Sequence, residues 1–226
     1  MAKGDIREVA YADYNNFGGA AGYGTRISFT TSPTAGDIIL LFVGSNTATQ
    51  TCTGYTTKES RTGSDTNFYL WGRYCTGGDS QDIDITLSVQ YANRGGVGYL
   101  IEGSFTDLND VTAYINNGGP STTLAIPASG QTVAAGTLAL AGCLSYGGVP
   151  TGFSNSFGTA NTNSTNGDYT TVARRAYASG DAGVTTTATY SASQDDMVGI
   201  LAAVYYGGGA ASIVPQAMAN YRMRAA

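Results

Sequence analysis

The chain has 226 residues, of which 42% are hydrophobic and only 12% are charged, and its formal net charge is −5. This composition allows a sizeable buried core and excludes a disordered chain. The 11 Lys and Arg residues are scattered, so they do not form the concentrated positive surface that nucleic acids require. No apolar run reaches the roughly 20 residues of a transmembrane helix. We therefore expect no nucleic-acid partner and no membrane partner.

The chain begins MAKGDIREVAYADYNN, which lacks the apolar segment of a secretory signal peptide. Synthesis and folding in a cytoplasm are therefore expected. The 32 Gly residues are about twice average usage and accompany many Thr, Ser, Asn and Tyr residues. Gly and Asn are typical of turns, whereas Thr and Tyr suit the half-buried surface of a pleated sheet. The composition predicts an all-β protein with many short strands.

Several strands are predicted in chain order. In DIILLFVGS, residues 37–45, both alternate sets of side chains are apolar, so this strand is expected to be central and covered on both faces. FYLWGRY (residues 68–74) follows as an aromatic strand. DIDITLSV (residues 82–89) alternates apolar and polar residues, which predicts one buried and one wet face. VGYLIEG (residues 97–103) is the last strand of this series.

A second series of similar segments follows about one hundred residues later, at an offset that drifts only from 98 to 104. Five blocks occur in the same order, which favours an internal duplication over a coincidence of β-rich composition. The period is too long for a solenoid or a propeller blade, so each copy is expected to be the size of a domain. The matched ranges are 14–19 with 114–119, 34–45 with 134–145, 54–55 with 152–153, 73–88 with 176–191, and 95–103 with 199–208.

Short strands without an intervening helical pattern predict two tandem β-sandwich units of jelly-roll-like type, with short terminal arms. The expected units are residues 1–105 with an N-terminal arm, residues 106–210, and a C-terminal arm over residues 211–226. The connection between the two sandwiches contains Thr106 and Asp107, which would start at most one helical turn.

The last segment, ASIVPQAMANYRMRAA, belongs to neither copy. It is either a frayed terminus or an arm that docks on a neighbouring subunit, and the N-terminal dozen residues raise the same choice. Two Met and one Tyr beside two Arg suit docking. The candidate partner-contact residues are Met218, Tyr221, Arg222, Met223 and Arg224.

The chain contains no His, which excludes Ser-His-Asp and Cys-His nucleophilic sites and imidazole metal ligands. Its three Cys residues are too few for a disulfide framework or a structural zinc site. Cys143 is expected to be a small buried side chain, and Cys52 and Cys75 would either pair across a sheet or stay free. Free thiols are the favoured interpretation, and no cofactor, metal site or catalytic residue is predicted.

Pairs of carboxylates would still serve a glycosidase as acid and base. The candidates lie beside Gly, Ser, Asn or Thr, which favours solvated turn carboxylates instead. A calcium site on the turn acids Asp181, Asp195 and Asp196 is a further alternative, without the spacing of an EF-hand. The candidate pairs are Asp79 with Asp82 or Asp84, Asp107 with Asp110, and Asp195 with Asp196.

Trp71 and Tyr69 share one strand and have two possible roles. Exposed aromatic rings often stack on sugars, so these residues are the candidates for glycan stacking. Aromatic residues more often fill the core of a sandwich or a subunit interface, which is the favoured interpretation.

The order of motifs resembles a β-sandwich module found among predicted phage virion proteins and phage-derived bacterial proteins. The shared features are Gly36-Asp37 before an aliphatic strand, a Gly54-Tyr55 turn, an aromatic strand that ends in Arg73-Tyr74, and a GGDSQDIDITLS hairpin. A closing YLIEG strand and a second, weaker copy complete the pattern. The resemblance covers residues 30–206 and carries no catalytic residues.

The resemblance implies a non-enzymatic structural protein of a bacteriophage particle, located in the virion after assembly in the host cytoplasm. The expected role is capsid decoration, with a head fibre or a tail component as alternatives. The expected partners are the major capsid protein or other virion proteins and further copies of this chain. The closest rival is a glycan-binding or receptor-binding module of a tail fibre or adhesin. A polysaccharide hydrolase that uses a carboxylate pair is third.

Overall fold

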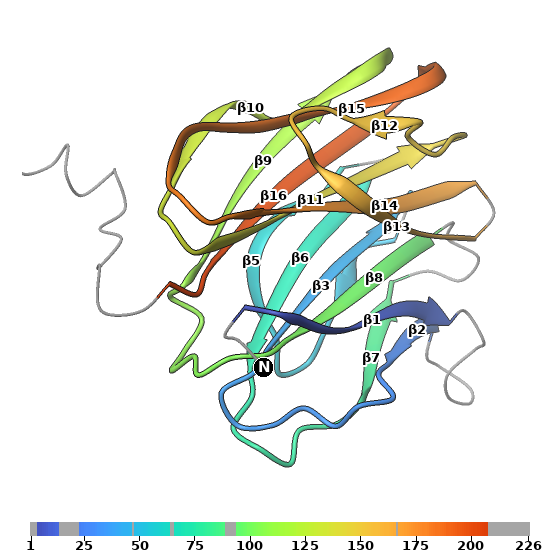
Figure 1. Ribbon diagram of the computed structural model, residues 1–226. Coiled ribbons are helices and arrows are strands. Elements are labelled where there is room, and N and C mark those ends of the chain that lie inside the picture. Colours follow the sequence, from blue (N-terminus) through green and yellow to red (C-terminus); the bar gives the residue numbers. More distant parts are fainter. Residues whose placement is uncertain are drawn as a thin grey trace, which may run out of the picture.

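The computed structural model describes residues 4–13, 23–46, 48–63, 66–88, 94–165 and 167–207. These residues form 16 strands and no helix, which confirms the all-β class (Figure 1). The sheets are antiparallel and curled, an arrangement consistent with a β-sandwich. No helical turn begins at Thr106 and Asp107, where the sequence allows one at most. The Asp107 carboxylate instead accepts the backbone N–H of Asn109 at 2.7 Å and stabilises a non-helical turn.

Eight strands lie in each half of the chain. The first eight are β1 (Ile6–Asp13), β2 (Tyr23–Ser28), β3 (Ile38–Ser45), β4 (Gln50–Thr51), β5 (Thr56–Arg61), β6 (Asn67–Tyr74), β7 (Asp82–Leu87) and β8 (Arg94–Ile101). The second eight are β9 (Val111–Gly118), β10 (Ser121–Val133), β11 (Thr137–Tyr146), β12 (Gly152–Phe153), β13 (Gly158–Thr165), β14 (Asp168–Tyr177), β15 (Asp181–Gln194) and β16 (Met197–Tyr205).

The strands of the two halves pair in the same order. In the first half, β5-β6-β3-β8-β1 form one sheet and β2-β7-β4 form another. In the second half, β13-β14-β11-β16-β9 and β10-β15-β12 repeat these six pairings. Two short contacts, between β1 and β2 and between β8 and β13, join 13 of the strands into one continuous sheet.

The largest hydrophobic cluster lies between the two five-stranded sheets, because it combines side chains of β3, β6 and β8 with side chains of β11, β14 and β16. Each half has a second cluster on the other side of its five-stranded sheet, against its three-stranded sheet. β3 therefore contributes Leu40 and Phe42 to the shared cluster and Ile39 and Leu41 to the cluster of its own half. This four-layer stack explains why both faces of β3 are apolar.

Two glycines allow the five-stranded sheets to approach closely. A Cβ atom on Gly142 would lie 2.3 Å from the Phe42 ring, and a Cβ on Gly44 would lie 2.5 Å from Leu144. Real Cβ atoms need more than 3 Å, so the Phe42 ring and the Leu144 side chain occupy the space that these glycines leave. The two contacts fix how the sheets sit on each other.

The N-terminal segment does not extend as an arm over residues 6–13, since these residues form β1 and pair with β8 from Ile6↔Ile101 to Tyr11↔Val97. The predicted boundary at residues 105 and 106 falls in the connection between β8 and β9. The C-terminal arm, residues 211–226, lies outside the described residues. Its candidate contact residues Met218, Tyr221, Arg222, Met223 and Arg224 lie there too and stay predictions.

Candidate functional site

Trp71 and Tyr69, the candidates for glycan stacking, are core residues. They are only 3% and 7% exposed, and their rings stack on each other at 4.9 Å with an interplanar angle of 12°. The indole N–H of Trp71 donates to the Thr57 hydroxyl at 3.2 Å. Stacking on a sugar requires an exposed ring face, and neither residue presents one.

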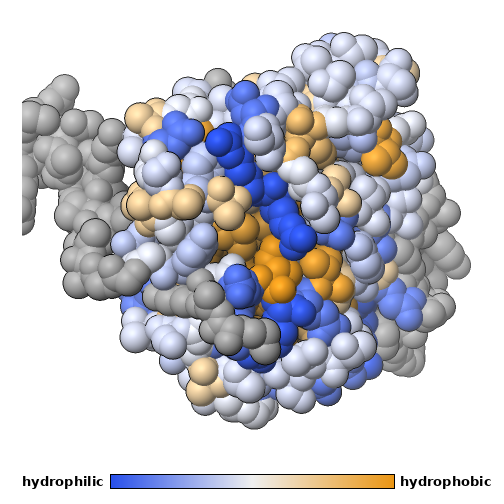
Figure 2. Space-filling view, viewed as in Figure 1, coloured by the Kyte–Doolittle hydropathy of each residue, from blue (hydrophilic) through white to orange (hydrophobic). Residues whose placement is uncertain are grey.

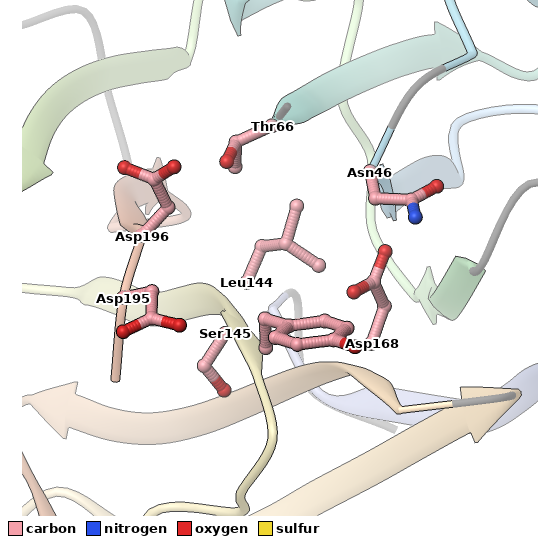
Figure 3. A pocket seen from close by; sticks show the side chains of 8 residues that line it. Asn46, Thr66, Leu144, Ser145, Asp168, Asp195 and Asp196 are labelled. Carbon is pink, nitrogen blue, oxygen red and sulfur yellow. The ribbon is translucent and has the colours of Figure 1, made fainter. Parts of the chain in front are cut away.

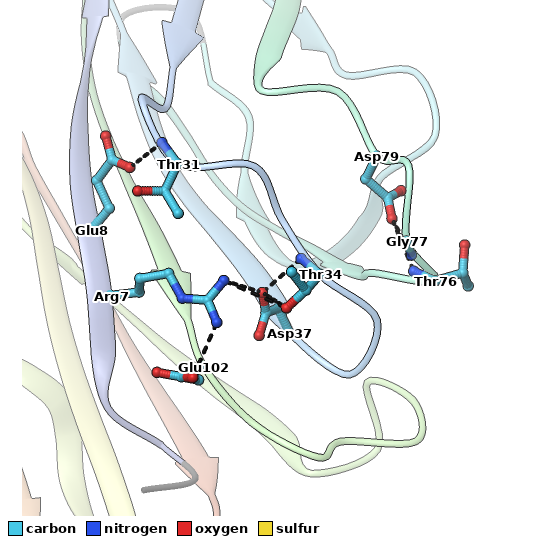
Figure 4. Close-up of polar contacts among 9 residues, drawn as sticks. All are labelled: Arg7, Glu8, Thr31, Thr34, Asp37, Thr76, Gly77, Asp79 and Glu102. Atoms are coloured by element: carbon cyan, nitrogen blue, oxygen red, sulfur yellow. Dashed lines mark hydrogen bonds and ion pairs between the residues drawn. The ribbon is translucent and has the colours of Figure 1, made fainter. Parts of the chain in front are cut away.

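The candidate carboxylates of the first half are engaged by their own surroundings. Asp79 accepts the backbone N–H groups of Thr76 and Gly77, at 2.9 and 3.2 Å (Figure 4). It also forms an ion pair with Arg73. Asp84 receives two hydrogen bonds from the Arg26 guanidinium, at 2.6 and 2.9 Å. These bonds hold the pKa of Asp84 below its ordinary value. These contacts hold loops and strands together.

A second polar network ties β1 to the loop before β3 (Figure 4). Arg7 donates to Asp37 at 3.0 Å and lies 3.1 Å from Glu102. Glu8 is partly buried, which raises its pKa, but the N–H groups of Thr30 and Thr31 outweigh this effect and lower it. The network therefore explains the Gly-Asp motif structurally: Asp37 anchors the N-terminal strand.

The structure does not bring together the three candidate calcium ligands, Asp181, Asp195 and Asp196. Asp181 begins β15 and Asp195 follows its end, so the two carboxylates lie at opposite ends of a 14-residue strand. Within the described residues, no three His, Cys, Asp or Glu side chains are grouped so that they would hold a metal ion. Asp107, a candidate of the carboxylate pairs, accepts hydrogen bonds from the backbone N–H and the side-chain amide of Asn109, in the turn before β9.

The three thiols, Cys52, Cys75 and Cys143, are free and buried, which confirms the favoured interpretation. Burial raises the pKa of each to about 12. A thiol with such a pKa carries almost no thiolate at neutral pH. These residues therefore act as small apolar side chains.

The strongest candidate site is a cavity of about 230 Å³ where loops of both halves meet, which we call the seam pocket. Asn46 follows β3 and Thr66 precedes β6, whereas the other residues come from the second half. Figure 3 shows Asp195 and Asp196 on one side of the pocket and Asp168 beside Asn46 on the other. The lining residues are Asn46, Thr66, Leu144, Ser145, Tyr146, Asp168, Asp195 and Asp196.

Asp168 is the most perturbed group of the seam pocket. Only 2% of the residue is exposed, and burial raises the pKa of its carboxyl to about 7. The backbone N–H of Asn46 opposes this shift by a hydrogen bond. The Oδ2 atom has no hydrogen-bond partner among the described residues. A buried carboxyl with a shifted pKa and an unused oxygen in a pocket marks a candidate binding or proton-transfer group.

Corresponding positions of the two halves line the seam pocket together. Ser45 pairs with Asn67 in β6, and Ser145 pairs with Tyr169 in β14, so Thr66 and Asp168 correspond. Asn46 and Tyr146 correspond in the same way, and Tyr146 is 50% exposed. The sequence predicts Asp195 and Asp196 as a candidate pair, and the structure brings both to this pocket.

Asp168, Tyr146 and Asn46 are not among the site residues that the sequence predicts. Asp168 follows Gly167 in a turn-like NGDY segment, which reads as a solvated loop. The one available signal is the repeat itself, because it places the ends of β3 and β11 in corresponding positions.

A second, open groove of about 800 Å³ lies between the start of the chain and β14. It combines the apolar Ile6 and Leu138 with the cations Arg174 and Arg175. On the face drawn in Figure 2, hydrophobic side chains gather in a hollow with hydrophilic residues along its border. Arg175 is already engaged, because it donates to the Asn155 carbonyl at 2.6 Å and lies over the Tyr177 ring.

The comparisons with known proteins give no match, whether with family models, curated proteins or solved structures. The part of the chain that the structure describes contains no helix with the length and hydropathy of a membrane span.

Proposed function

We propose that this chain is a non-enzymatic structural protein of a bacteriophage particle, built from two tandem jelly-roll-like sandwiches that arose by internal duplication. In this proposal it decorates the capsid, binding the major capsid protein or other virion proteins on the outer surface as a homo-oligomer. The observation that carries the proposal is the repeated order of strand pairing, which supports the two copies of one β-sandwich module that the resemblance implies.

Matching hydrogen bonds one hundred residues apart support the duplication. The Ser45 hydroxyl donates to the Ala48 carbonyl at 2.6 Å, and the Ser145 hydroxyl donates to the Gly148 carbonyl at 2.7 Å. Gly36 and Gly136 both have positive φ, at 91° and 76°. Details of this kind are not needed for an apolar core, so they favour common descent over convergence of composition.

The sheet β10-β15-β12 is the surface that we assign to subunit contacts. Among the residues of these three strands only Asp181 is charged. The side chains of β15 that face away from the core are Thr185, Thr187, Thr189 and Ser191. A face with so few charges is cheap to desolvate in a protein–protein contact. The corresponding face of β7 carries charged groups, Asp82 and Asp84 with Arg26 beside them.

The test is co-sedimentation of the chain with capsids assembled from the capsid genes encoded beside its own gene. We expect binding and a higher melting temperature of the decorated particles. Thr189→Glu is expected to lower occupancy at least tenfold, because it buries a charge in the contact. Thr86→Glu on the outer face of β7 is the matched control, with unchanged occupancy.

Equal occupancy for the two variants would refute the assignment of the face. A gene neighbourhood without capsid or portal genes, or failure to co-sediment, would refute the virion role. Deletion of residues 212–226 tests the arm separately: weaker attachment of a folded protein is expected, and unchanged attachment would contradict the arm.

A further inference from the structure

The seam pocket gathers acidic side chains. Among its described lining residues, three are carboxylic acids and none is Lys or Arg. The carboxylates come from the start of β14 and from the turn between β15 and β16, so two separate elements direct acids to one cavity. Acids gathered in a partly enclosed space raise the local concentration of cations.

Asp168 gives the second, independent indication of a ligand. The Oδ2 atom is buried and unused among the described residues, although one more hydrogen bond would satisfy it. An unsatisfied buried acceptor costs about 1–3 kcal/mol, and more when it is charged. A donor that enters the pocket would recover this cost. The backbone N–H of Asn46 keeps the carboxyl in position meanwhile.

Tyr146 indicates which chemical class of hydrogen-bond donor the seam pocket would bind. Its side chain is half exposed and lines the same cavity as the three carboxylates. An aromatic ring beside carboxylates is the combination that recognises organic ammonium groups, through ion pairing and cation–π contact. A bare divalent cation fits less well, because no three acidic side chains of the described ranges are close enough to coordinate one.

We propose that the seam pocket binds an organic ammonium group, carried by a free polyamine or by a lysine side chain. The ammonium donates to Asp168 Oδ2, Asp195 and Asp196 balance its charge, and its alkyl chain contacts Leu144 and Tyr146. The cavity of about 230 Å³ is smaller than the sites of drug-sized ligands, about 300–1,000 Å³, and suits one slender chain. This proposal goes beyond capsid decoration and does not depend on it.

The test is calorimetric titration of the full chain with spermidine and with Nα-acetyl-lysine methylamide, which separate the two sources of the ammonium group. Nα-acetyl-norleucine methylamide, which lacks the charge, is the neutral control. Saturable binding of at least one amine and none of the neutral compound is expected. Asp168→Asn and Asp195→Asn are each expected to weaken binding at least tenfold, and Tyr146→Leu about threefold.

Asp181→Asn is the matched variant, because it removes the same charge at the far end of β15 and is expected to bind as the parent does. Asp195→Asn keeps the test decisive if Asp168→Asn does not fold, since Asp195 is an exposed turn residue. Equal binding by all three Asn variants, equal binding of the norleucine compound, or no saturable amine binding would overturn the proposal. Saturable Ca²⁺ binding without amine binding would also overturn it.

Discussion

Asp168 shows how one residue links the fold to pH. Its pKa of about 7 lies above the ordinary value of 3.8, because burial disfavours the charged form. Between these two values the folded chain keeps a proton that the unfolded chain releases. The free energy of unfolding therefore falls as the pH rises from about 4 to about 7, by up to about 4 kcal/mol. Above pH 7 this contribution is constant.

Asp168→Asn removes this dependence, because the amide has the shape of the carboxyl and never ionises. We expect the variant to be more stable than the parent at pH 8 and nearly equal to it at pH 4. Thermal unfolding followed by circular dichroism across this range measures the effect. Asp181→Asn, at the start of β15, is expected to follow the parent curve. Parallel curves for the parent and Asp168→Asn would contradict the elevated pKa.

Gly142 is the second residue with a defined consequence. Gly142→Ala places a methyl group within 2.3 Å of the Phe42 ring and is expected to destabilise the fold by about 1–3 kcal/mol. Gly152→Ala is the control, because nothing lies within 4 Å of its added Cβ. Urea unfolding of both variants measures the difference. A smaller side chain in Phe42→Leu is expected to relieve part of the cost in the double variant.

At the scale of elements, side-chain patterns predict the strands and their buried faces well. They predict poorly which other elements pair with or pack against each strand. The alternation in DIDITLSV predicts the buried and exposed faces of β7 correctly from Asp82 to Leu87. The doubly apolar β3 is correctly central. For the N-terminal dozen residues, the sequence leaves a choice between a frayed terminus and an arm. It does not predict β1, because the partners of Arg7, Asp37 and Glu102, lie far away in the sequence.

The site was harder to predict than the strands for a physical reason. A carboxylate beside Gly in a turn is normally solvated, whereas Asp168 is buried and accepts a backbone hydrogen bond from Asn46 of the other half. The sequence pattern also contains no information about which partner covers the second apolar face of β3. That information resides in the packing of Phe42 on Gly142, a contact between residues one hundred positions apart.

The double burial of β3 gives a prediction for a whole element. Leu40→Ala and Leu41→Ala face opposite sides of the sheet, and each is expected to cost about 2–5 kcal/mol, because both side chains are fully buried. Thr86→Ala, on the wet face of β7, is expected to change stability by less than about 0.5 kcal/mol. Denaturant unfolding compares the three. A negligible cost for Leu40→Ala would contradict the packing of the two five-stranded sheets against each other.

At the scale of the molecule, the shared cluster is expected to make the two halves one cooperative unit. A separate first half would expose the face that carries Leu40, Phe42, Leu70 and Tyr99. We expect residues 1–105 or 106–210 expressed alone to aggregate, and the two co-expressed to form a soluble pair. The intact chain is expected to unfold in a single calorimetric transition. Two soluble monomeric fragments, or two separated transitions, would refute this interdependence.

The glycine contacts between the sheets also decide which halves are compatible. Phe42 lies on Gly142 and Leu144 lies on Gly44, and these are corresponding positions. Two first halves brought together in this geometry would set one Phe42 ring against the other and leave glycine opposite glycine. The clash between the two Phe42 rings and the cavity between the two glycines would disfavour the pairing of two identical halves. Neighbouring copies, however densely arrayed, would therefore not join through two first halves or two second halves at this face.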